Sequence, residues 1–331
     1  MSDEAEIKIT MLGGSGAGKT CFMLAMFDVM SFGVEGFTFT TVDWDDGLDL
    51  EDQWNKLREG TDLDRWPKGT SGSRSYKFRF SYGAKTYLTF EWLDYRGGAL
   101  TGRSDDPDLP TLRANLKESF GIFIVVPADQ LIKDDYQAQR GLNLNRVNQL
   151  LNELRDQAPE KGFLPVVSLV VTKMDIWCKA FGKDRKEELV ARLSKLFNPL
   201  FASGSGWTVS IVPVSLGEGL CDDLANAAIE PIAIHYPITF TIHELYQGHN
   251  KAVDVERASI RTRADENRKR PKAWWQQMLG TNDDHDPEIE EQIAQLDLWA
   301  EACGAACKTI GRSLRADIPV FKNGEQTDVK S

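Results

Sequence analysis

Short apolar runs alternate with longer amphipathic segments along the first two thirds of the chain. The runs occupy residues 7–12, 121–126, 164–171 and 209–214. They are rich in β-branched residues and end at turn-forming residues, a pattern typical of buried strands. Helical periodicity separates them, for example over residues 143–157 and 186–197. Strands that alternate with helices predict crossover connections, and therefore an α/β fold whose mainly parallel sheet carries helices on both faces.

A hairpin is predicted between the first two of these runs. Residues 76–81 and 85–93 are alternating or apolar and lie on either side of Tyr82-Gly83, which favours two antiparallel strands. We therefore expect one antiparallel edge strand in the sheet. The second strand of the hairpin ends at Asp94, and ligands of such sheets bind at the carboxyl ends of strands.

Two regions depart from this regular alternation. The stretch before the hairpin has poor periodicity, an acidic patch and a turn-rich end, so we expect a long mobile insertion at about 32–74 that contains a short helix. Beyond Gly217 the chain is mostly helical and ends in a predicted helix at 288–314. We expect one domain over residues 1–250 and a helical C-terminal extension over residues 251–331.

The composition is that of a soluble globular protein. The chain has 331 residues, of which 41% are hydrophobic and 27% are charged, enough for a large core with an appendage. Its net charge of −11 disfavours attraction to nucleic acid or anionic membranes, so no nucleic-acid partner is expected. Five cysteines, an N-terminus without a signal-peptide pattern and no apolar run of about 20 residues predict a cytoplasmic protein without a transmembrane segment.

A glycine-rich loop follows the first predicted strand. The sequence GGSGAGKT at residues 13–20 matches the pattern GxxxxGK(S/T) and stands between a predicted strand and a predicted helix. In such a loop the glycine amides and the helix N-terminus face phosphate oxygens, while Lys19 reaches the β- and γ-phosphates and Thr20 can bind magnesium. A glycine-rich turn before a helix is the alternative interpretation, but the flanking strand and helix favour phosphate binding.

Two further motifs follow in chain order. Asp94 and Gly97 form a DxxG pattern at a strand end, where the carboxylate can hold magnesium through water and the Gly97 amide can contact a γ-phosphate. Residues 172–175, TKMD, fit (N/T)KxD after a buried strand. The Asp175 carboxylate can accept both the N1–H and the N2 amine of guanine, and the Lys173 stem can lie across the base. A strand-end turn and a helix N-cap are the alternative interpretations of the two motifs.

The three motifs in this order, followed by Ser215-Leu216 after the last strand, resemble those of Ras-like P-loop GTPases of the TRAFAC class. The long stretch before the hairpin, with the sequence WPKGT, is most similar to the bacterial double-GTPase type, which implies a place in bacterial signalling or conflict (defence) systems. The resemblance implies a Ras-like P-loop NTPase fold with a GTP/GDP and Mg²⁺ site, in which Leu216 replaces the usual alanine of a base-contacting loop. The residues that it assigns to nucleotide binding are Gly13, Gly14, Ser15, Gly16, Ala17, Gly18, Lys19, Thr20, Cys21, Thr172, Lys173, Asp175, Ser215 and Leu216.

The resemblance also implies the magnesium ligands. Thr20 and Asp94 are two of them, directly or through water. A threonine of the first mobile segment is the third, and it also covers the γ-phosphate. Thr70 is the first candidate for this role, and Thr40 and Thr41 are its rivals.

The predicted catalytic set is Lys19, Thr70 and Gly97. Ras-like GTPases that hydrolyse efficiently usually carry a glutamine directly after DxxG to orient the attacking water, and this chain has Gly98 there. We therefore expect slow hydrolysis unless a partner, or Arg96 or Arg103, supplies the missing group.

These observations predict a GTP-controlled molecular switch that acts through a protein effector or activating partner. A basic stretch with two tryptophans, residues 257–275, offers a weak contact for a membrane or a partner, although a solvated helix is the favoured interpretation. One alternative function is a scaffold that holds a nucleotide permanently without hydrolysing it. Another is an ATP-using enzyme, which leaves the TKMD motif unexplained.

Overall fold

The computed structural model of the chain contains a central sheet with helices packed on it. It describes residues 6–68, 74–83, 85–95, 98, 108–161, 163–248, 308–309, 311–312, 314 and 318–327. The chain divides into two compact units, residues 1–241 with 314–330 and residues 242–313 with residue 331. The candidate site lies in the first unit. The predicted domain boundary at residue 250 stays a prediction, because most residues after 248 lie outside the described part.

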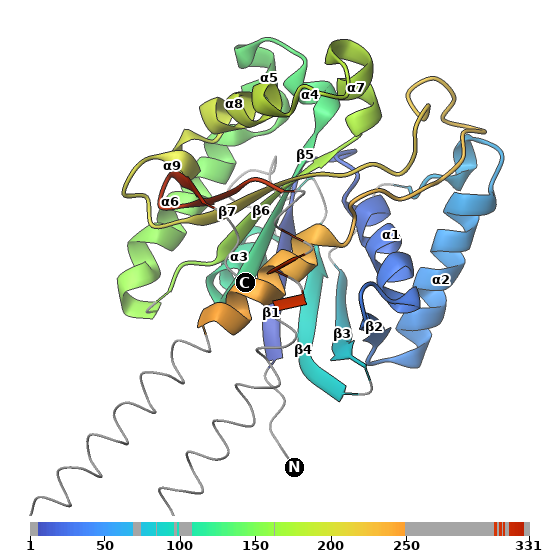
Figure 1. Ribbon diagram of the computed structural model, residues 1–331, viewed down its shortest axis with the longest axis horizontal. Helices are drawn as coiled ribbons and strands as arrows, with labels where there is room; N and C mark the ends of the chain where they lie inside the picture. The colour runs from blue at the N-terminus through green and yellow to red at the C-terminus, as the bar shows by residue number, and fades with distance from the viewer. Residues whose placement is uncertain are drawn as a thin grey trace, which may run out of the picture. The chain divides into compact units, whose positions relative to one another are not determined.

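Nine strands form one sheet within the described residues, in the order β2-β3-β4-β1-β5-β6-β7-β8-β9 (Figure 1). The strands are β1 (Glu6–Leu12), β2 (Phe37–Thr41), β3 (Arg74–Tyr82), β4 (Lys85–Asp94), β5 (Ser119–Pro127), β6 (Val166–Thr172), β7 (Thr208–Pro213), β8 (Val320–Lys322) and β9 (Glu325–Thr327). The five central strands, β4, β1, β5, β6 and β7, are parallel. Their carboxyl ends therefore meet along one side of the sheet.

Both edges of the sheet are antiparallel, so the prediction of one antiparallel edge strand is wrong. On one side β3 pairs with β4 through the predicted hairpin, and β2 pairs with β3. On the other side β8 pairs with β7, and β9 with β8. The prediction that residues 251–331 are helical is therefore also wrong for β8 and β9. The missed signal is Asn323-Gly324, whose positive φ values of 55° and 85° suit the tight turn between these strands.

Helices cover both faces of the sheet (Figure 1). They are α1 (Lys19–Phe32), α2 (Trp44–Glu59), the 3₁₀ helix η1 (Leu63–Arg65), α3 (Asp108–Glu118), α4 (Ala128–Leu131), α5 (Asp135–Gly141), α6 (Leu144–Lys161), α7 (Met174–Phe181), α8 (Lys186–Leu196), α9 (Asn198–Phe201) and a helix over residues 236–248. On one face the ring of Phe22 in α1 lies 6.0 Å from that of Trp92 and 6.3 Å from that of Phe123. On the other face α3, α6 and α8 bury a continuous leucine-rich cluster.

Alternate residues of the parallel strands supply these two layers. In β5, Phe123 contacts the α1 layer, whereas Ile122 and Ile124 belong to the cluster under α3, α6 and α8. Successive side chains of a strand point to opposite faces, so a strand covered on both faces is apolar at nearly every position. This explains why residues 121–126 form a continuous apolar run.

The segment predicted as a mobile insertion contains a strand and a long helix. β2 joins the sheet beside β3. α2 has 16 residues, and its N-cap Asp43 accepts hydrogen bonds from two backbone amides of the first turn. The prediction of only a short helix here is wrong, because α2 buries just Leu50, Trp54 and Leu57. Its other large apolar residues, Trp44 and Leu48, are exposed, so the apolar positions give a weak periodic signal.

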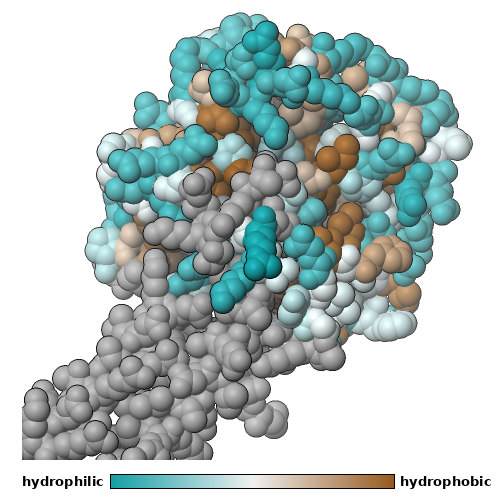
Figure 2. Space-filling view, viewed as in Figure 1, coloured by the Kyte–Doolittle hydropathy of each residue, from teal (hydrophilic) through white to brown (hydrophobic). Residues whose placement is uncertain are grey.

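The face seen in Figure 2 is mostly hydrophilic, with separate hydrophobic patches. No helix in the described part of the chain is long and apolar enough to span a bilayer.

Candidate functional site

The glycine-rich loop lies between β1 and α1, where its backbone adopts conformations that need glycine. Gly16 and Gly18 have φ values of 71° and 91°, in the left-handed region. A Cβ atom on Gly13 would lie 3.0 Å from the carbonyl oxygen of Val125, so β5 leaves little room for a side chain there. The backbone of this loop therefore depends on three glycines, two for their conformation and one for its small size.

Lys19 folds back over this loop from the first turn of α1. Its side chain is only 7% exposed. Its Nζ donates hydrogen bonds to the carbonyl oxygens of Gly13 at 3.0 Å and Gly14 at 3.1 Å. Burial lowers the pKa of Lys19, and the nearby carboxylate of Asp94 opposes that shift. The ammonium is thus held at the mouth of the loop.

Asp94 ends β4 and contacts α1. It is 2% exposed, and its Oδ2 accepts a hydrogen bond of 3.0 Å from Thr20 Oγ1. Its second oxygen, Oδ1, is buried without a hydrogen-bond partner. Burial raises the pKa of Asp94, and Lys19 and the Thr20 hydroxyl oppose the rise. A buried carboxylate oxygen without a partner is costly unless a cation or water satisfies it.

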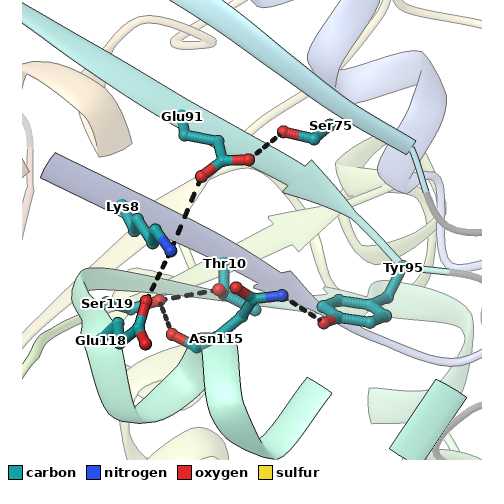
Figure 3. Close-up of polar contacts among 8 residues, drawn as sticks. All are labelled: Lys8, Thr10, Ser75, Glu91, Tyr95, Asn115, Glu118 and Ser119. Atoms are coloured by element: carbon teal, nitrogen blue, oxygen red, sulfur yellow. Dashed lines mark hydrogen bonds and ion pairs between the residues drawn. The ribbon is translucent and has the colours of Figure 1, made fainter. Parts of the chain in front are cut away.

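Tyr95, the next residue, anchors the end of β4 to α3 (Figure 3). Its hydroxyl accepts a hydrogen bond of 2.8 Å from Asn115 Nδ2. Burial raises the pKa of Tyr95 to about 12. Ser119 donates to the carbonyl oxygen of Asn115, and its hydroxyl shares a 2.7 Å hydrogen bond with that of Thr10 in β1. The strand before the glycine-rich loop and the strand that ends in Asp94 are thereby tied to the same helix.

The TKMD motif lies at the junction of β6 and α7. Thr172 Oγ1 donates a 2.7 Å hydrogen bond to the carbonyl oxygen of Ala17 in the glycine-rich loop. Lys173 has a left-handed φ of 56° and its Nζ forms an ion pair of 2.9 Å with Asp129 after β5. Asp175 lies in the first turn of α7. The TKMD motif is therefore joined directly to the glycine-rich loop.

Ser215 and Leu216 begin a loop that closes on itself. Ser215 forms reciprocal backbone hydrogen bonds with Ile232, of 3.2 and 2.8 Å. The carbonyl oxygen of Leu216 accepts a 2.6 Å hydrogen bond from the amide of Glu230. These contacts hold the start of the loop beside the end of β7.

One cavity of about 570 Å³ brings most of the predicted residues together. Those on its wall are residues 15–21, Thr172, Lys173, Asp175, Ser215 and Leu216. Its volume is typical of small-molecule sites. Cys21 is among these residues, and burial raises its thiol pKa to about 12. Gly13 and Gly14 line a smaller cavity of about 210 Å³ instead, and Asp94 contacts the larger cavity only through Thr20.

Most of the residues predicted to act at the γ-phosphate lie outside the described part of the chain. Thr70, Arg96, Gly97 and Arg103 lie outside the described residues, as does the basic stretch 257–275. Thr40 and Thr41 lie in β2, paired with β3, and are not among the residues that line the larger cavity. Gly98 is described and does line it.

Sequence reasoning missed several residues on the cavity wall. Trp66, Pro67 and Lys68 reach it from the segment after α2, and Leu220 and Leu224 from the loop after β7. The turn-forming Pro67 marks a loop in the sequence, but nothing local shows where that loop packs.

A family model and solved structures are similar to this chain. The family model described as Double-GTPase 2 matches residues 7–212. A comparison with curated proteins found no match. A crystal structure of sup35 in complex with GDP is similar at 15% identity and a TM-score of 0.30, covering 65% of this chain and 38% of that one. The S. cerevisiae Ski7 GTPase-like domain bound to GTP is similar at 13% identity and a TM-score of 0.40, covering 64% and 43%. This chain spans less than half the length of either.

Proposed function

The chain belongs to the Double-GTPase 2 family, and from this premise we propose that it binds GTP, hydrolyses it slowly with Mg²⁺ and acts as a nucleotide-controlled switch. Family membership confirms the predicted resemblance to double-GTPase-type proteins. The observation that carries the proposal is the buried Asp94, with one oxygen on Thr20 and the other without a hydrogen-bond partner. Thr20 lines the same cavity as Asp175.

The phosphates would bind to the glycine-rich loop and Lys19. An ammonium has three donors, and Lys19 directs two of them to the carbonyl oxygens of Gly13 and Gly14. The third can reach a phosphate oxygen. Burial lowers the pKa of Lys19, and a polyphosphate beside it would favour the charged form.

The residues present fit a divalent cation. Mg²⁺ prefers oxygen ligands and is commonly bound through one or two carboxylates plus substrate phosphates. Thr20 Oγ1 and Asp94 supply such oxygens, directly or through water, and a cation there would satisfy Asp94 Oδ1. When bound, Mg²⁺ neutralises charge on the β- and γ-phosphates. Thr70 is the proposed third ligand.

The base would lie beside Asp175. A carboxylate accepts two hydrogen bonds from the N1–H and N2 amine of guanine, and adenine offers neither donor on that edge. The ion pair with Asp129 orients Lys173, and the hydrogen bond from Thr172 keeps the motif at a set distance from the phosphate loop. Ser215 and Leu216 complete the base contacts from the end of β7, the strand next to β6.

Hydrolysis is attack of water on the γ-phosphorus, assisted by charge stabilisation. Gly98 lines the cavity but has no side chain to orient that water, so turnover is slow. Gly97 and Thr70 contact the γ-phosphate and so distinguish GTP from GDP. A partner protein, Arg96 or Arg103 raises the rate of hydrolysis. The protein acts in the cytoplasm on a protein effector, as part of a bacterial signalling or defence system.

Calorimetry on the full chain with Mg²⁺ tests the proposal. We expect heat of binding with GTP and GDP, little with ATP, and a large loss of affinity in Lys19→Ala. Lys117→Ala, which removes an exposed lysine at the end of α3, is the matched control. The proposal fails if neither guanine nucleotide binds, or if Lys19→Ala binds as tightly as the control.

Gly98 also favours a second candidate function, a scaffold that keeps its nucleotide. Stopped-flow exchange with a fluorescent GTP analogue, together with pull-downs in the GTP and GDP forms, separates the two. A switch exchanges its nucleotide and changes partners with it, whereas a scaffold does neither.

A further inference from the structure

Two segments far apart in sequence meet at the cavity wall. The first, residues 60–68, follows α2 and is called the strap. The second, residues 215–232, follows β7 and is called the capping loop. Trp66, Pro67 and Lys68 of the strap line the larger cavity together with Leu220 and Leu224 of the capping loop.

Arg65 joins the two segments from a buried position. It is 3% exposed. One guanidinium nitrogen donates a 3.0 Å hydrogen bond to the carbonyl oxygen of Gly60, within the strap. A second guanidinium nitrogen, Nη2, donates a 2.8 Å hydrogen bond to the carbonyl oxygen of Ala227, in the capping loop. Because a buried guanidinium is costly without acceptors, Arg65 keeps these carbonyl groups in place.

Trp66 makes a second link directly beside the first. Its Nε1 donates a 2.9 Å hydrogen bond to the carbonyl oxygen of Leu224. The guanidinium carbon of Arg65 lies 5.2 Å from the centre of the Trp66 ring, within the range of a cation–π contact. Two consecutive strap residues thus hold two carbonyl groups of the capping loop.

The capping loop has hydrogen bonds of its own at its ends and at its tip. Its ends are joined by the backbone pair of Ser215 and Ile232. Its tip is ordered by Asp223, whose carboxylate accepts hydrogen bonds from the amides of Ala225 and Asn226. The amide of Ala227 also donates a 3.1 Å hydrogen bond to the carbonyl oxygen of Asp223, so the carbonyl groups that Arg65 and Trp66 contact belong to a loop with several internal hydrogen bonds.

We propose that Arg65 and Trp66 are positioning residues that hold the strap against the capping loop and thereby set the rate at which bound nucleotide leaves the cavity. The inference rests on the proposed function, since it requires a nucleotide in that cavity. The two hydrogen bonds close the wall where the segments meet, and separating the segments breaks both bonds. The preference for guanine over adenine is kept, because Asp175, whose carboxylate distinguishes the two bases, lies in α7, outside both segments.

Two conservative variants of the full chain remove one link each. Trp66→Phe keeps an aromatic ring and removes the Nε1 donor. Arg65→Lys keeps the positive charge but cannot span both carbonyl groups, because an ammonium lacks the guanidinium fork. Matched controls are Trp44→Phe, at a residue that is 79% exposed, and Arg79→Lys, at an exposed position of β3. Dissociation of a directly excited fluorescent GDP is followed by stopped flow with excess unlabelled GDP.

A net hydrogen bond contributes about 1 kcal/mol and one to a charged group about twice that. We therefore expect release to be roughly fivefold faster in Trp66→Phe and at least about tenfold faster in Arg65→Lys. The GTP-to-ATP preference stays as in the wild type, and both controls release GDP within about twofold of it.

Three outcomes overturn the inference. The first is wild-type release rates in both variants, which leaves the proposed function intact. The second is equal acceleration in the controls. The third is no binding of GDP to the wild-type chain, which removes the proposed function as well. If Arg65→Lys does not fold, as thermal melting shows, the rate in Trp66→Phe decides alone.

Discussion

The contact between Thr172 and Ala17 tests whether the base motif and the phosphate loop act as one unit. Thr172 is 6% exposed and Ala17 is 2% exposed, and their hydrogen bond is 2.7 Å long. Thr172→Val preserves the shape and the methyl group near Gly18 but removes the donor. The buried carbonyl oxygen of Ala17 then loses its side-chain partner, which costs about 1–3 kcal/mol.

That cost has two measurable consequences. Without nucleotide, the melting temperature falls by about 2–4 °C for each kcal/mol in a domain of this size. With nucleotide, the loop amides are less well oriented, so the affinity for Mg·GDP falls by up to about 100-fold. Thr172→Ser restores the hydroxyl and should recover most of both losses. Calorimetry and thermal melting measure them, and the reasoning is refuted if Thr172→Val matches the wild type in both or if Thr172→Ser is no better than Thr172→Val.

Three other predictions concern the same site. Asp175→Asn should weaken GTP binding by at least about tenfold. It should improve the binding of xanthosine triphosphate, because the C2 carbonyl of xanthine accepts a hydrogen bond from the asparagine amide. Calorimetry measures both affinities, and an equal loss for the two nucleotides would contradict guanine recognition by Asp175. Burial raises the pKa of Asp94 in the folded chain. Between about pH 3.9 and that raised value, the folded cation-free chain therefore binds more protons than the unfolded chain, so the free energy of unfolding falls as the pH rises. The stabilisation by Mg·GDP should grow over this window in thermal melts, and the same growth in Asp94→Asn would contradict the assignment. Basal GTP turnover should be on the order of 10⁻³ s⁻¹ or slower, and rapid phosphate release from the purified chain alone would show that Gly98 is not limiting.

Much of the site could be predicted because its chemistry is local in sequence. Gly13, Gly18, Lys19 and Thr20 lie within eight consecutive residues, and conformational freedom, charge and a hydroxyl at that spacing identify a phosphate loop before any fold is known. The parallel centre of the sheet could be predicted equally well, since strands that are buried on both faces are apolar without interruption. The order of the motifs then indicated the family.

Contacts between distant segments were decided by the tertiary structure alone. Asn323-Gly324 marks a turn, but only the exposed edge of β7 makes its flanking residues into strands. Thr172 and Ala17 are 155 residues apart, and Arg65 and Ala227 are 162 apart. A residue type states which hydrogen bond a side chain can make, whereas its partner depends on how the whole chain packs. The sequence by itself therefore determined the phosphate loop and the parallel core, while packing decided the edge strands, the strap and the burial that leaves Asp94 Oδ1 without a hydrogen-bond partner.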